Sequence, residues 1–458
     1  MKRLFLLLLL LLPLSVAAKS GYRFTLQIDG NTDTMLVVGY YHAQNLRILD
    51  TAYNNGRGRF VFEGGRELKP GLYYFTDTKG RFLDFVVYHE KPYFKFHTDN
   101  RDWKRNMTVS GSKENTLFFN FNRSTEVVYA ELEAARGNMD SAALADYRVQ
   151  QFHRLDTLRM AFIGQHPQSM LARMMLATKE PATPPDSLQG NDRYFYLMQH
   201  YFDNIPLDDD FIVRTPRSVF YDRVNEYVEK RMQGLTPDLI IPLLDTIIDR
   251  SEPAPEVYRW LLVTLTEHYL QSPVMVYDEV YVHLVQRYFA TGKADFLAPS
   301  TIDEQVERAS KWERLLVGRE APELILFDTT RRVWSLHHMP GRYTLLLFWS
   351  PTCGHCRTIV PELYKVFDRL ADSVDMTAFA ILSEPDDGTV KKWKRFLKEH
   401  DMDNPRWVNL NGGEANIDWR EVYDVQTTPQ VYLVDNKTHR FLAKKLNAEL
   451  LELVCKQL

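Results

Sequence analysis

The chain has 458 residues, of which 45% are hydrophobic and 25% charged, and its formal net charge is −4. This length predicts several domains, and the composition is that of a globular protein with sizeable cores. The small net charge, without a long run of one sign, argues against nucleic acid as a partner. Aromatic residues make up 13% of the chain, which argues against disorder over most of its length.

The N-terminus has the pattern of a secretory signal peptide. Lys2 and Arg3 precede an apolar run that ends at Leu12, and small residues offer a cleavage site near Ala17 or Ala18. The run is short for a membrane span, although an uncleaved anchor helix is the alternative. No cysteine nearby could carry a lipid, and no later segment has about 18 apolar residues. We therefore expect a periplasmic protein that does not span the membrane after cleavage.

The chain contains three cysteines, Cys353, Cys356 and Cys455. An exported protein stabilised by disulfides would have more of them, spread along the chain. Two of the three form a CxxC motif directly after an apolar strand pattern and at the expected start of a helix. Free N–H groups and the dipole of a helix N-terminus can lower a cysteine pKa from about 8.5 to roughly 3.5–7.5. The pattern predicts a redox-active dithiol, whereas Cys455, on an amphipathic C-terminal helix, is expected to be a buried, inert thiol.

The chain divides into three segments after a signal peptide over residues 1–18. Residues 19–111 alternate with period two between Gly, Asn and Asp turns, which predicts an antiparallel β sandwich or barrel-like domain. Residues 112–316 have apolar positions at helical spacing and Pro-rich breaks, which predicts an all-α middle domain. Strand and helix patterns alternate over residues 317–458, which predicts an α/β domain. The histidines of the first segment are scattered, so we expect no metal site: His42, His89 and His97.

The α/β segment can be followed element by element. It begins with a short hairpin, continues with strands and helices, and ends with a C-terminal helix. The main elements expected are a strand over Tyr343–Trp349, a helix over Cys353–Leu370, a strand over Met376–Leu382, a helix over Val390–Glu399 and a strand over Gln430–Val434. The two strands before Val390 have no charged side chains, so both should be central in a sheet.

Five motifs together resemble the thioredoxin fold. They are the lead-in GREAPEL, the strand YTLLLFWS, the motif CGHC, the helix RTIVPEL and the TTP before a strand. The helix between the two central strands resembles the insertion of TlpA-type exported thioredoxins. The preceding sheet and helical segments resemble a three-part architecture known in exported Bacteroidetes proteins. The resemblance is specific over residues 317–458 and architectural before them.

The resemblance implies roles for individual residues. Cys353 would be the attacking cysteine and Cys356 the resolving one. Pro429 matches the cis-proline of the family, which faces the dithiol, and Thr428 would present backbone groups to a substrate. Trp349, close to the motif in sequence, is a further candidate for substrate binding.

The dipeptide between the cysteines, Gly354 and His355, resembles that of disulfide isomerases. A charged His355 near Cys353 would stabilise the thiolate and make the couple more oxidising. The alternative is that His355 is only an exposed polar residue.

Two departures from the family concern the proton acceptor of the resolving thiol. The TlpA group often has a Glu three residues after the second cysteine, where this chain has Ile359. Thioredoxins bury an Asp six residues before the first cysteine, where this chain has Leu347. Glu384 and Glu362 are the candidate substitutes.

The leading hypothesis is an exported thiol–disulfide oxidoreductase that acts on protein disulfides or dithiols without a metal or an organic cofactor. A reductase role would need a membrane thiol electron donor, whereas CGHC favours oxidase or isomerase work, so the direction stays open. The alternative is a partner-binding protein whose thioredoxin-like domain is an accessory or a redox sensor.

Overall fold

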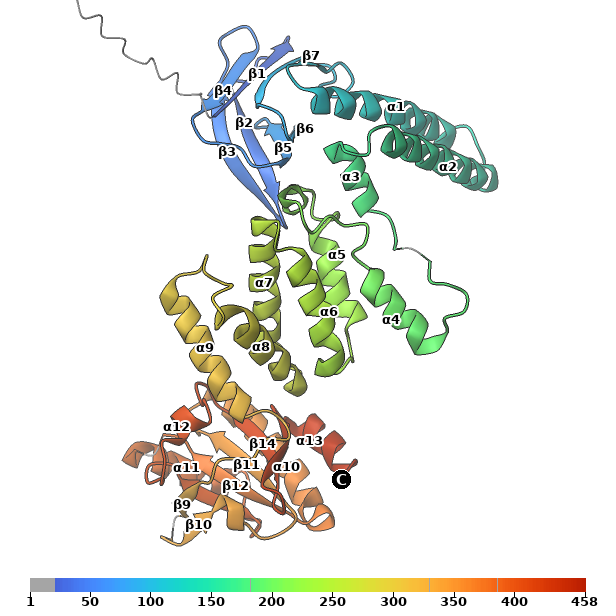
Figure 1. Cartoon of the computed structure of the whole chain (residues 1–458). Helices are drawn as coiled ribbons and strands as arrows, with labels where there is room; N and C mark the ends of the chain where they lie inside the picture. The colour runs from blue at the N-terminus through green and yellow to red at the C-terminus, as the bar shows by residue number, and fades with distance from the viewer. Residues whose placement is uncertain (1–20, 182, 329, 385) are drawn as a thin grey trace, which may run out of the picture. The chain divides into compact units, whose positions relative to one another are not determined.

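The computed structural model describes residues 21–458 except 182, 329 and 385, so the predicted signal peptide lies outside the described residues. The chain forms two compact units. Figure 1 colours the chain by residue number. One holds residues up to Gln233 with Ile247–Tyr258, and the other holds Gly234–Thr246 with Arg259–Leu458. Within the described ranges, no helix is long and apolar enough to cross a membrane. The predicted division at residues 111 and 316 remains a proposal.

The N-terminal region is β-rich, as predicted, and consists of two four-stranded sheets with strand orders β4-β1-β7-β8 and β3-β2-β5-β6. Its strands are β1 (Tyr22–Asp29), β2 (Met35–His42), β3 (Asn45–Tyr53), β4 (Arg59–Gly64), β5 (Gly71–Thr76), β6 (Phe82–Val87), β7 (Tyr93–Asp99) and β8 (Thr108–Ser110). Aromatic side chains join the sheets, and the rings of Phe24 and Phe85 lie 5.0 Å apart. One pairing departs from the antiparallel prediction, because β1 and β7 run parallel. The described strands do not close into a barrel.

The middle of the chain is helical, as predicted. Its α-helices are α1 (Lys113–Arg136), α2 (Ser141–Gln165), α3 (Met170–Ala177), α4 (Gly190–His200), α5 (Tyr221–Glu226), α6 (Pro237–Arg250), α7 (Pro255–Leu270), α8 (Asp278–Leu284) and α9 (Pro299–Arg314). Two of these helices end in a π-helical turn, α5 in Tyr227–Arg231 and α8 in Val285–Phe289. Helices α6 and α7 contribute residues to both units.

The C-terminal part contains one seven-stranded sheet with the order β10-β9-β13-β12-β11-β14-β15. Its strands are β9 (Ile325–Asp328), β10 (Val333–Ser335), β11 (Tyr343–Trp349), β12 (Met376–Leu382), β13 (Trp407–Asn411), β14 (Gln430–Asp435) and β15 (Arg440–Lys444). Its helices are α10 (Gly354–Val374), α11 (Asp387–Glu399), α12 (Trp419–Val422) and α13 (Ala448–Cys455). Every residue of β11 and β12 is buried, as their uncharged sequences predicted.

Two hydrophobic clusters cover the two faces of this sheet, because side chains alternate along a strand. Leu345, Leu347 and Trp349 of β11 join the cluster that includes residues of α10, α11 and α13. Leu346 and Phe348 face the opposite cluster, which includes residues of α12. Helix α10 therefore packs on β11 with its N-terminus at the end of that strand. Because β14 runs antiparallel to β11, with Gln430 opposite Phe348, the start of β14 lies at the same edge.

Candidate active site

The CxxC motif lies at the N-terminus of α10. Cys353 is the residue before the helix and is half-buried, whereas Cys356, in the first turn, is 0% exposed. Both are free thiols. The strand–turn–helix expected from the sequence thus presents one thiol at the surface and holds the other in the core.

The environment of Cys353 favours its thiolate. Burial by itself would raise the pKa, but hydrogen bonds from the backbone N–H of Cys356, from the Thr428 side chain and from the backbone of His355 outweigh it, so the pKa of Cys353 is lowered. These N–H groups are the free donors of a helix N-terminus. Cys353 is therefore the better nucleophile of the two thiols at neutral pH.

Cys356 has the opposite environment. Burial raises the pKa of this thiol to about 11, and the neighbouring Cys353 adds to the shift. The backbone N–H of Ser350 donates to its Sγ over 3.5 Å and counteracts the shift only in part. Cys356 is a thiol at neutral pH and must lose a proton before it can attack.

The loop before β14 faces the dithiol. The Thr428–Pro429 peptide bond is cis, as the resemblance implied. The Sγ of Cys353 lies 3.2 Å from the carbonyl oxygen of Thr428 and donates to it in the thiol form. Pro429 lines the same cavity as His355. The structure thus brings Cys353 together with Thr428, 75 residues later in the sequence, and with the adjacent Pro429.

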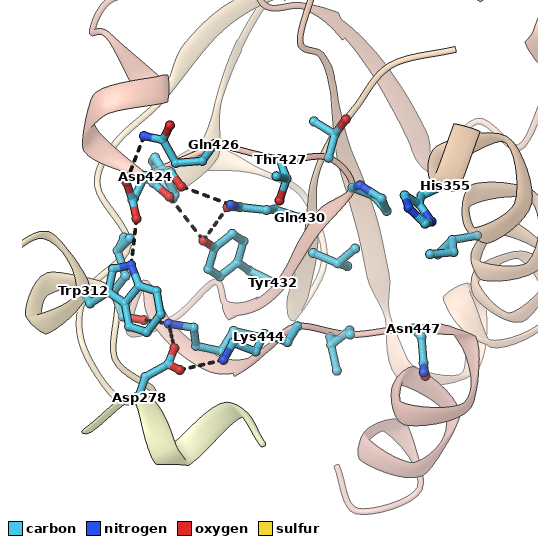
Figure 2. A pocket seen from close by; sticks show the side chains of 18 of the residues that line it. Asp278, Trp312, His355, Asp424, Gln426, Thr427, Gln430, Tyr432, Lys444 and Asn447 are labelled. Carbon is cyan, nitrogen blue, oxygen red and sulfur yellow. Dashed lines mark hydrogen bonds and ion pairs between the residues drawn. The ribbon is translucent and has the colours of Figure 1, made fainter. Parts of the chain in front are cut away.

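The dipeptide between the cysteines is exposed. A Cβ at Gly354 would meet nothing within 4 Å, so packing does not demand glycine there. The His355 side chain faces the cavity in Figure 2. The backbone of His355 lowers the pKa of Cys353 through a hydrogen bond. Tuning of that pKa by the charge of the His355 side chain stays a prediction.

Of the two candidate proton acceptors, only Glu384 lies at the site. Its Oε2 accepts hydrogen bonds from the hydroxyls of Ser350 (3.2 Å) and Thr352 (3.1 Å). Ser350 also donates its backbone N–H to Cys356, so a single residue links the carboxylate to the resolving thiol. Glu362 is 65% exposed and forms an ion pair with Lys365. Sequence reasoning missed Ser350 and Thr352, although both flank the motif.

Trp349 requires a correction. We predicted that it binds substrate, but its side chain is 0% exposed and lies in the core cluster, with its ring 5.2 Å from that of Phe396. It lies on the central strand β11, where both faces of the sheet are covered and every side chain is buried. Leu347 faces the same core, whereas Ile359 lines the cavity.

A cavity of about 760 Å³ opens beside the dithiol (Figure 2). One part is formed by His355 and the loop before β14, and the other by residues that the sequence did not indicate. The latter come from α8, α9, the loop after α12 and the end of β15: Asp278, Arg308, Trp312, Asp424, Lys444 and Lys445. No local motif could have indicated them, because they meet only through the tertiary fold.

A CxxC at a helix N-terminus with one accessible and one buried thiol, facing a cis-proline loop on a mixed sheet, defines the thioredoxin-like class of thiol–disulfide oxidoreductase domains. In agreement, residues 341–440 match the family described as thioredoxin-like. The C-terminal domain therefore belongs to the thioredoxin-like family. Residues 22–118 and 158–312 match two domains of unknown function, DUF4369 and DUF5106.

Curated proteins that are similar to this chain have thioredoxin-like or thiol-disulfide oxidoreductase names. Thioredoxin-like protein YneN of Bacillus subtilis is 27% identical over 120 residues, which are 26% of this chain and 66% of that protein. Thiol-disulfide oxidoreductase ResA of Bacillus cereus is 25% identical over 126 residues, 28% of this chain and 68% of that protein. The chain thus spans about two thirds of the length of these curated relatives.

One solved structure shows that the fold is shared. The crystal structure of a thioredoxin-like protein from Bacteroides caccae has a TM-score of 0.50 and 18% identity, and it covers 61% of this chain and 98% of that one.

Proposed function

We propose that this chain is an exported thiol–disulfide oxidoreductase that exchanges disulfides with protein substrates through its CGHC dithiol. Cys353 is the nucleophile, Cys356 the resolving thiol, and Thr428 with Pro429 forms the substrate-facing loop. The observation that carries the proposal is the opposite shift of two adjacent thiols. The pKa of the accessible Cys353 is lowered, and that of the buried Cys356 is raised to about 11.

The exchange occurs in two steps. The Cys353 thiolate attacks one sulfur of a substrate disulfide, so a Cys353–substrate bond forms, the substrate S–S bond breaks and the other sulfur leaves as a thiolate. Cys356 then loses its proton and attacks Sγ of Cys353, which releases the second substrate thiolate. The substrate gains two electrons and two protons, and the enzyme dithiol becomes a disulfide.

The same steps run in reverse when a substrate dithiol is oxidised. The relative reduction potentials of enzyme and partner set the direction. In the reductive direction a dithiol donor must restore Cys353 and Cys356, and we propose a membrane thiol protein for this role.

Glu384 is the proposed proton acceptor for the resolving thiol. Its hydrogen bond with the Ser350 hydroxyl sets a carboxylate next to the residue that contacts Cys356. A base in this position compensates for the high pKa of Cys356.

Export to the periplasm is the second part of the proposal. It is supported by the basic, apolar and small-residue pattern that ends near Ala17 and Ala18. Mass spectrometry of the mature N-terminus tests it, and an intact Met1 on the purified protein from its host would contradict it.

Insulin reduction and refolding of scrambled ribonuclease test the catalytic part. We expect activity in at least one assay for the wild type and for Cys455→Ala, the matched control with a buried cysteine away from the motif. Cys353→Ala should abolish the activity, and Cys356→Ala should accumulate mixed disulfides with substrate proteins. If the wild type is inactive in both assays and Cys356→Ala forms no mixed disulfides, the partner-binding alternative is favoured instead.

A further inference from the structure

The cavity beside the dithiol has a second wall that includes residues of the helical segment before the α/β part. Arg308 and Trp312 of α9 line it together with Asp278 at the start of α8, and Figure 2 labels Trp312 and Asp278. Its volume of about 760 Å³ is in the range of specific ligand sites. The cavity is therefore large enough to hold several side chains next to Cys353.

Hydrogen bonds and ion pairs hold this wall in place. The indole Nε1 of Trp312 donates to Oδ2 of Asp424 over 2.7 Å. Asp278, 1% exposed, lies 2.5 Å from the Nζ of Lys444 and 2.7 Å from that of Lys445. Lys444, 5% exposed, also donates to the carbonyl oxygen of Leu315. Such a network keeps the groove formed before a ligand arrives, which reduces the entropy lost on binding.

The opposite side of the cavity offers backbone groups. Among the described residues, none accepts a hydrogen bond from the backbone N–H of Thr427 or of Thr428. Both residues line the cavity directly before Pro429. Unpaired N–H groups beside the dithiol are suited to pair with the backbone of a peptide. The occupant that these groups fit is an extended polypeptide.

The charges of the lining indicate which side chains that polypeptide carries. Two carboxylates, Asp278 and Asp424, face three cations, Arg308, Lys444 and Lys445. Both carboxylates are already engaged, Asp278 by the two lysines and Asp424 by Trp312 and by the side-chain amide of Gln426.

Arg308 differs from the two lysines because its carboxylate partner is exposed. It is 30% exposed, and its ion-pair partner Glu304, one turn earlier on α9, is 64% exposed. Exposed pairs of this kind are weak and easily replaced.

We propose that this groove binds the segment next to the reacting cysteine of a protein substrate and prefers an acidic side chain there, with Arg308 of α9 as the residue that recognises it. This inference rests on the proposed exchange activity and adds a specificity determinant from the helical region. Helix α9 thus has a role in substrate selection.

The test uses the full chain and two synthetic peptides. Both carry one cysteine as a mixed disulfide with a chromogenic thiol and differ only in having Glu or Lys at the flanking positions. We expect the wild type to prefer the Glu peptide in kcat/KM by about fivefold, as suits one partly exposed ion pair. The ratio should fall to about twofold in Arg308→Ala and invert in Arg308→Glu. It should also shrink in high salt.

Arg314→Glu is the matched control, because Arg314 is an exposed arginine on the same helix that does not line the cavity. It should keep the wild-type ratio. The same peptides with Ser in place of Cys, measured by fluorescence anisotropy, report binding without chemistry and should show the same preference.

The outcomes separate the two proposals. Normal turnover with equal rates for both peptides, or a preference unchanged by Arg308→Glu, would overturn the groove proposal and leave the exchange activity standing. Absence of turnover in the wild type would overturn the exchange activity itself, and an anisotropy preference that persists without turnover would support the groove as a peptide-binding site only.

Discussion

Replacement of Asp278 by Asn should strongly destabilise the second unit. Asp278 is 1% exposed and is the carboxylate partner of Lys444, which is 5% exposed. The substitution keeps the shape of the side chain but leaves Lys444 as a buried cation. Lys445 is less affected, because it is 30% exposed and can turn to water.

The expected loss is about 3–5 kcal/mol in the free energy of unfolding, which is the range for removing one partner of a buried ion pair. The value should lie near the lower end, because Lys444 retains its hydrogen bond to the carbonyl of Leu315 at 3.2 Å. Replacing both partners, Asp278→Leu with Lys444→Met, should recover most of the loss, since buried pairs are often no better than apolar residues of similar volume.

The pH dependence of the single variant follows from Lys444. Burial lowers the pKa of this lysine below its usual value, and the loss of Asp278 should lower it further. The folded state then binds fewer protons than the unfolded state in alkaline solution, so stability rises with pH up to about 10.4, the unfolded pKa of lysine. The difference in the free energy of unfolding between the wild type and Asp278→Asn should therefore shrink as the pH rises.

The assay is urea unfolding monitored by tryptophan fluorescence and by the reactivity of Cys356 and Cys455, both buried in this unit. Glu399→Gln is the control, because it removes an exposed ion pair with Arg395, and it should leave the unfolding midpoint unchanged. This prediction would be refuted if Asp278→Asn lost less than about 1 kcal/mol in the free energy of unfolding. It would also be refuted if the double variant Asp278→Leu with Lys444→Met were as unstable as Asp278→Asn.

Three further predictions concern the site. The rate of alkylation by iodoacetamide should rise with pH at Cys353 with a midpoint below the usual thiol pKa of about 8.5. Cys356 should react only as the pH nears its pKa of about 11. Equal midpoints for the two cysteines would contradict the opposite shifts of their pKa values. Glu384→Gln should slow the resolution of the mixed disulfide by roughly tenfold or more in single-turnover measurements, whereas Glu362→Gln should not, and equal rates in both variants would remove Glu384 from the mechanism. Trp349→Ala should lower the free energy of unfolding by about 3–5 kcal/mol without a specific rise in KM, while a stable variant with a raised KM would restore its predicted contact with substrate.

Much of the fold could be predicted because its signals are local. The strands Tyr343–Trp349 and Met376–Leu382 have the predicted bounds, since their uncharged runs can only be buried. Strand β3 lacks an inward-facing apolar pattern, because its large apolar residues face solvent, with Ile48 71% exposed, so periodicity could not locate it. The parallel pairing of β1 with β7 was also missed, because partners far apart in sequence leave no local signal.

The two cysteines and the proline loop were predictable as a dithiol site because the chemistry demands those residue types. The substrate contact predicted for Trp349 does not fit its burial, because closeness to the motif in sequence does not show that both faces of a central strand are covered. The contact of Glu384 with Ser350 was beyond prediction in detail, since it joins loops after two different strands.

By itself the sequence determined the thioredoxin-like class of the C-terminal part and the β, helical and α/β regions, and it proposed Cys353 and Cys356 as the reacting thiols, because a CxxC motif and hydrophobic periodicity act over short distances along the chain. The tertiary structure alone decided the difference between the pKa values of Cys353 and Cys356 and the second wall of the cavity. Burial, hydrogen bonds and charge pairing set both, and these depend on residues brought together from separate elements, such as Asp278, Arg308 and Lys444.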